Sequence, residues 1–121
     1  MKVVFSRGQR AEKGLLGGNK GVTFTVSCRL QLSQAENALV EKYWPADTMM
    51  GSQDDSIALG VRIGTTKPGV RLADLTQGCS AEGKSVGTMQ EVESLIVTVC
   101  RSFSNYITAA AEYQGEQAVE V

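Results

Sequence analysis

Apolar and polar residues alternate most regularly over residues 22–32. Every second position from Val22 to Leu32 is apolar, while the positions between carry Thr, Ser, Arg and Gln. This period of two predicts a strand with one dry face and one wet face, which favours an antiparallel sheet. The β-branched run at residues 2–6 predicts an earlier strand. Residues 57–75 alternate on both sides of a Pro-Gly turn, which predicts a hairpin.

Two segments instead repeat apolar residues at spacings of three and four, which is typical of helices. Ser33 and Glu36 form the capping-box pattern S-x-x-E ahead of about three helical turns, which Pro45 ends. Thr88 and Glu91 repeat that pattern at the start of a helix over residues 88–113. Its apolar stripe comprises Met89, Val92, Ile96, Val99, Phe103, Tyr106 or Ile107, and Ala110.

These elements predict an α+β fold. We expect a mainly antiparallel sheet of about four strands, in the order β-β-α-β-β-α along the chain, with two helices packed on one face and the second helix long. We expect residues 1–121 to form a single domain. Residues 7–21 are predicted to be a flexible, basic, glycine-rich loop, and residues 116–121 a tail or a short edge strand.

Composition narrows the chemistry. The chain has 121 residues, of which 42% are hydrophobic and 21% charged, as expected for a globular protein. It contains no histidine, which excludes histidine-based catalytic and metal sites. Its three cysteines are widely spaced and predict neither a disulfide framework nor a metal site. We therefore expect no catalytic residue, no cofactor and no metal, in a cytoplasmic protein without a signal peptide or membrane span.

The charge distribution suggests one binding site. Residues 1–32 carry six basic residues and one acidic residue, a net charge of +5. The remaining residues carry six basic and twelve acidic residues, a net charge of −6. Glycines and cations in one loop can bind an anion, and two arginines are predicted to face each other across the hairpin. The candidate anion-binding residues are Arg7, Arg10, Lys13, Gly18, Asn19, Lys20, Arg62 and Arg71. The alternative is a solvated loop whose charges aid solubility.

A second candidate site contains aromatic and methionine residues, which are frequent at binding surfaces. The candidate interaction surface comprises Tyr43, Trp44, Met49, Met50, Phe103, Tyr106 and Ile107. The alternative is that these side chains complete the core.

Our leading hypothesis is a non-catalytic interaction module that forms a homo-oligomer. The final predicted helix, about 39 Å long, exceeds the width of about 35 Å expected for such a domain, so a partner could cover part of it. The alternative function is binding of a nucleotide or another phosphate-bearing small molecule through the basic loop and the sheet. Nucleic-acid binding is less favoured because aromatic residues are sparse.

Overall fold

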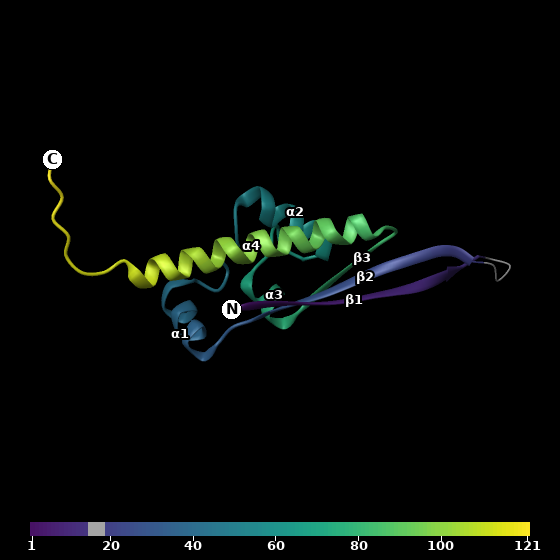
Figure 1. Cartoon of the computed structure of the whole chain (residues 1–121), viewed down its shortest axis with the longest axis horizontal. Coiled ribbons are helices and arrows are strands. Elements are labelled where there is room, and N and C mark those ends of the chain that lie inside the picture. Colours follow the sequence, from purple (N-terminus) through teal and green to yellow (C-terminus); the bar gives the residue numbers. More distant parts are fainter. Residues whose placement is uncertain (15–18) are drawn as a thin grey trace.

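The computed structural model describes residues 1–14 and 19–121, which form an α+β fold with a three-stranded antiparallel sheet in the order β1-β2-β3 (Figure 1). A long helix, α4, runs along the sheet. The elements are β1 (Lys2–Lys13), β2 (Asn19–Gln31), α1 (Gln34–Tyr43), α2 (Gln53–Ile63), α3 (Leu72–Gln77), β3 (Cys79–Gly83) and α4 (Val86–Glu112).

The two faces of the sheet differ in chemistry. Directly opposed residues of antiparallel strands share a face, so the register defines an inner face and an outer face. The inner face packs against the core through Val26, Cys28 and Leu30, all buried. The outer face is polar. Three exposed serines lie side by side on it, one from each strand: Ser6, Ser27 and Ser80.

The hairpin formed by β1 and β2 extends well beyond the helical layer (Figure 1). The pairing of β3 with β2 runs only from Cys28 to Phe24, whereas β1 and β2 continue to pair as far as Lys13 and Asn19. We call the part of the hairpin beyond Phe24 the arm. Val22 belongs to the dry side of its strand but lies on the arm, so it is 37% exposed.

The core lies between the sheet and α4 and continues under α1 and α2. At the sheet-distal end of α4, Trp44 at the end of α1 packs edge-on against Phe103, with 4.9 Å between ring centroids. Contacts within the chain therefore bury most of the apolar stripe predicted for this helix. The buried residues of α4 are Met89, Val92, Ile96, Val99, Cys100, Phe103 and Ile107.

Two helices confirm the sequence patterns. Ser33 caps α1 with both hydrogen bonds of the capping box, and α1 ends at Tyr43, ahead of Pro45. The long final helix is also present. It begins two residues earlier than predicted because Ser85 is the N-cap and its hydroxyl accepts a hydrogen bond from the Thr88 N–H.

The prediction of four strands in the order β-β-α-β-β-α is wrong. Residues 57–75, predicted to be a hairpin, instead include the greater part of α2 and of α3. The buried residues of α2 are Ser56, Leu59 and Gly60, which have helical spacing, while Val61 of the apparent alternation is 77% exposed. A serine and a glycine hold two of the buried positions, so hydrophobicity alone did not reveal the helical face.

The third strand lies in a segment to which no element had been assigned. β3 (Cys79–Gly83) consists mostly of small residues, which have weak strand propensity, and it forms because it pairs with the central strand β2. In the segment expected to be a flexible loop, residues 7–13 belong to β1 and residues 19–21 to β2. Residues 116–121 form neither a helix nor a strand.

Candidate interaction site

The free edge of β1 and one flank of α4 form a groove. Among the described residues β1 pairs only with β2, so the backbone groups along its other edge have no strand partner. Phe5 of β1 faces Val97 and Arg101 of α4 across a hollow of about 640 Å³. Arg101 forms no ion pair within the part of the chain that the structure describes. The groove thus combines strand backbone, apolar surface and an unpaired cation.

A second hollow continues this groove towards the arm. It has a volume of about 430 Å³ and lies between β1, β2 and the start of α4. Phe24, Val86 and Met89 supply its apolar lining, and Val86 is 51% exposed. Gln90 and Glu93 line both hollows, so the two belong to one surface. We refer to both hollows and the β1 edge together as the edge groove.

An ion pair crosses the edge groove between its two hollows. Arg7 donates hydrogen bonds to both carboxylate oxygens of Glu93, with Nε 3.0 Å from Oε2. The Glu93 side chain is only 13% exposed, whereas that of Arg7 is 67% exposed. The Arg7 hydrogen bonds hold the pKa of Glu93 below its ordinary value despite the opposing effect of partial burial. This bridge ties the edge strand to α4.

The stabilising effect of this bridge should decrease in acid. A carboxylate whose folded pKa is depressed stabilises the fold above its unfolded pKa, about 4.3, and loses that contribution as pH falls through the folded pKa. We therefore expect Glu93→Gln to lower the urea midpoint at neutral pH. The difference from the wild type should shrink as the pH falls below about 4.

The control is Glu112→Gln, because Glu112 is exposed at the end of α4. It should leave the urea midpoint close to that of the wild type at both pH values. A Glu93→Gln difference that stays constant from neutral to acid pH would contradict an ionised Arg7–Glu93 contact.

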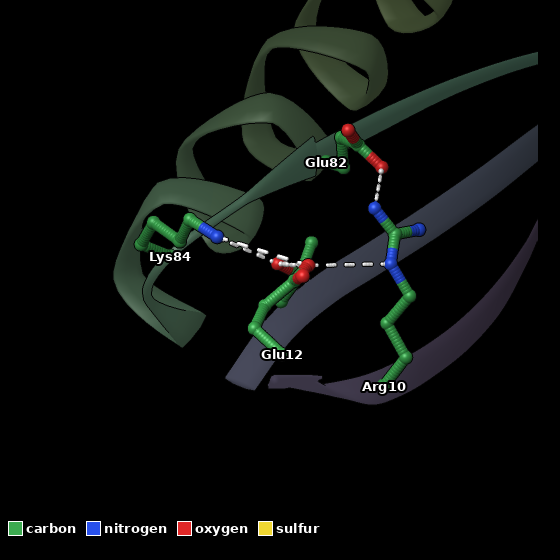
Figure 2. A network of polar contacts seen from close by, with 5 residues as sticks. Arg10, Glu12, Glu82 and Lys84 are labelled. Carbon is green, nitrogen blue, oxygen red and sulfur yellow. Dashed lines mark hydrogen bonds and ion pairs between the residues drawn. The ribbon is translucent and has the colours of Figure 1, made fainter. Parts of the chain in front are cut away.

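A polar network on the outer face fixes the base of the arm to the rest of the sheet. Figure 2 shows Arg10 between Glu12 and Glu82, at 3.3 and 3.1 Å, with Lys84 on the far side of Glu12. Thr23 donates a hydrogen bond to Glu12 and accepts one from Lys84 at 2.9 Å. The Thr23 hydrogen bond and then the Lys84 charge lower the pKa of Glu12. Carboxylates thus neutralise the cations at this position.

The predicted anion-binding residues are distributed over several surfaces. Arg7 and Arg10 lie on opposite faces of the sheet, and both pair with carboxylates. Arg62 lies on α2 near Glu91, and Arg71 precedes α3, where its guanidinium donates to the Pro68 carbonyl. The other predicted residues are Lys13 at the end of β1, Asn19 and Lys20 at the start of β2, and Gly18, which lies outside the described residues.

Most of the predicted interaction surface lies in or against the core. Met50, Phe103 and Ile107 are buried, and Tyr43, Trp44 and Met49 are half-buried. Tyr106 is 51% exposed, and its ring is 5.1 Å from that of Trp44. The structure brings Trp44, Phe103 and Tyr106 together, but as a contact between α1 and α4.

Sequence reasoning did not identify the α4 side of the edge groove. Glu93, Val97 and Arg101 recur every four residues, which places them on one flank of the helix. This spacing is visible in the sequence. The sequence does not show that this flank lies beside Phe5, because that contact depends on which flank of α4 faces the free edge of β1.

Cys28 and Cys100 are buried packing residues, whereas Cys79 is half-buried. Cys28 and Cys79 lie opposite each other across β2 and β3, and a hydrogen bond between the thiols together with burial raises the pKa of Cys28. The same hydrogen bond lowers the pKa of Cys79, which is half-buried. Burial raises the pKa of Cys100 to about 12. Thiols of high pKa are poor nucleophiles, so Cys28 and Cys100 offer no reactive centre.

The described residues lack two features. No helix among them is both long and apolar enough to cross a membrane. They also contain no group of three or more acidic or cysteine side chains positioned to hold a metal ion. No protein-family model matches the chain, and neither the curated proteins nor the solved structures include one that matches it.

Proposed function

We propose that this protein is a non-catalytic interaction module that binds an extended polypeptide segment along the free edge of β1. The observation that carries the proposal is the edge groove, in which the free edge of β1, a strand of 12 residues, runs beside the flank of α4. Strand addition at such an edge supplies affinity through main-chain hydrogen bonds, while pockets for alternate side chains supply specificity.

The lining of the edge groove suits such a segment. Alternate side chains of an added strand point to one face of the sheet, at intervals of about 6.6 Å. On the inner face they would meet Phe5 and Val97 in one hollow, and Phe24 and Met89 in the other. A partner with apolar residues at every second position would bury them there.

The charges of β1 restrict the partner. Natural edge strands carry lysine and arginine, which discourage uncontrolled pairing between copies. β1 contains Lys2, Arg7, Arg10 and Lys13 against Glu12, a net charge of +3. Pairing β1 with β1 of another copy would bring like charges together, whereas an acidic segment would be attracted. The free edge of β1 therefore disfavours pairing with another β1 strand and favours pairing with an acidic strand.

This reading is better supported than binding of a phosphate-bearing small molecule. Arg7 and Arg10 already pair with carboxylates, and Arg62 and Arg71 lie on the helical side of the molecule, away from the arm. An anion would have to displace these ion pairs one by one. An added strand needs only the free edge.

Selection from a phage-displayed library of random peptides tests the proposal. The wild type should enrich peptides with alternating apolar residues, and these should bind far more weakly to Val97→Trp, whose indole fills the hollow beside Phe5. Ser94→Trp is a second blocking variant on the exposed surface of α4.

Ser102→Trp is the matched control. It adds the same side chain to an exposed position of α4 that does not line the edge groove. It should retain binding, and thermal unfolding should show that all three variants fold. If no peptide prefers the wild type and Ser102→Trp over both blocking variants, the proposed function is wrong.

A further inference from the structure

We infer that the segment bound in the edge groove is residues 113–121 of a second copy of this chain, an inference that rests on the proposed function. These residues follow α4 and form neither helix nor strand, and in Figure 1 they lead away from the body of the molecule. Tyr113, Val119 and Val121 are exposed. The described residues therefore include both a strand edge without a strand partner and an exposed segment that belongs to no helix or strand.

The pattern of this segment matches the groove. In an extended conformation Val119 and Val121 point to one side, and Glu116 and Glu120 point to the other. Added to β1, the valines would contact Phe5 on the inner face. The glutamates would then lie over the outer face of the sheet.

The outer face offers cations at that position. Lys2 of β1 and Arg29 of β2 lie on this face, where Arg29 is directly opposite Val4. Neither forms an ion pair among the residues that the structure describes. Glu116 or Glu120 would supply a carboxylate to Lys2, since opposite charges on neighbouring strands attract. Arg29 lies one strand further from the added segment, on β2.

Net charge supports the same pairing. Residues 113–121 contain two glutamates and no basic residue, a net side-chain charge of −2. The strand β1 carries +3, and its two cations without an ion pair among the described residues are Lys2 and Lys13. The attraction should be sensitive to salt, because exposed charges are screened within about 8–10 Å at ordinary ionic strength.

The reach of the segment favours a second copy over the same chain. Arg101 lies beside Phe5, and the helix continues for eleven residues to Glu112, about 16 Å further along its axis. Returning over that distance would use about five extended residues at roughly 3.3 Å each and leave only about four to pair. On another copy the whole of residues 113–121 can lie along β1.

Sedimentation of the full chain is the first test. The average mass of the wild type should rise with protein concentration, and this rise should weaken in high salt. Val119→Asp combined with Val121→Asp should remain a monomer, because aspartates cannot enter the apolar hollow. A wild type that is monomeric at every concentration overturns the inference.

A fluorescent peptide comprising residues 112–121 tests the site directly. It should bind the Val119→Asp/Val121→Asp protein, whose β1 edge is unoccupied, and Val97→Trp in that background should raise the dissociation constant at least tenfold. Ser102→Trp should leave it unchanged. Lys2→Glu should weaken binding, and a peptide carrying Glu120→Lys should restore it, whereas Lys42→Glu on α1 serves as a charge control.

The outcomes separate this inference from the proposed function. If the peptide fails to bind while library peptides still bind the edge groove, the second-copy inference falls and the proposed function stands. If neither binds, both fall. A monomeric wild type whose tail variant nevertheless binds the peptide would show that the segment folds back on its own chain, which also overturns a second copy as the partner.

Discussion

Replacing Phe103 with alanine should lower the free energy of unfolding by about 3–5 kcal/mol, as is usual when a buried aromatic ring is deleted. Phe103 is 1% exposed and is among the largest fully buried side chains. Its ring contacts the edge of Trp44, so its loss removes the apolar surface that joins α4 to the end of α1. Urea denaturation followed by fluorescence measures the effect, because Trp44 is the only tryptophan.

Tyr106→Ala is the matched control for this contact. Tyr106 also lies edge-on to Trp44, but half of its surface is exposed, so its removal should cost only about 1 kcal/mol. Both variants alter the surroundings of the same fluorophore. If Phe103→Ala destabilised the protein no more than Tyr106→Ala, Phe103 would not lie in the core, and the interaction-surface reading of this cluster would regain support.

The elements that the sequence predicted correctly are those whose local pattern and tertiary environment agree. Ser33 and Glu36 specify the start of α1 through two hydrogen bonds that need no distant partner. The stripe of α4 runs over many turns, so its period is unambiguous. Similarly, the alternation of residues 22–32 matches a strand whose Val26, Cys28 and Leu30 are buried on one face while Ser27 and Arg29 are exposed on the other.

Prediction failed where small or polar residues occupy buried positions. Ser56 is fully buried because its hydroxyl bonds to the backbone of Val70, accepting from N–H at 2.8 Å. Gly60 is buried because the backbone of Gly69 lies close to it. Neither residue contributes to a hydrophobic pattern. The apolar residues of α2 therefore suggested a period of two. In the structure the Ser52 hydroxyl caps this helix by accepting a hydrogen bond from the Asp55 N–H.

The candidate site was less predictable than the fold because it depends on topology. Arg7 stood out in the sequence as a cation in a glycine-rich segment, yet its partner, Glu93, is 86 residues away. The groove exists because β1 is an edge strand, and no local pattern states which strand of a sheet lies at the edge. The charge distribution is the one sequence signal that pointed to this region, because the N-terminal third of the chain is basic and the remainder is acidic.

Gly69→Ala should be the second strongly destabilising substitution, at about 2–5 kcal/mol from backbone strain and overpacking together. Gly69 has φ +91°, a conformation that residues with a side chain rarely adopt. An added Cβ would also meet the Met49 sulfur and would lie 2.7 Å from the Ser56 hydroxyl oxygen. That hydroxyl is the acceptor for the buried Val70 N–H, so displacing it leaves a buried donor unsatisfied.

Gly64→Ala separates the two contributions. Gly64 ends α2 with φ +70°, but nothing lies within 4 Å of an added Cβ, so this variant reports backbone strain alone, about 1–2 kcal/mol. The excess cost of Gly69→Ala over Gly64→Ala, read from urea unfolding, then measures the crowding between α2 and the segment before α3. Equal costs would mean that Ser56 and Met49 can move aside freely. In that case the buried hydrogen bond between Ser56 and Val70 would not explain why residues 57–75 form helices instead of a hairpin.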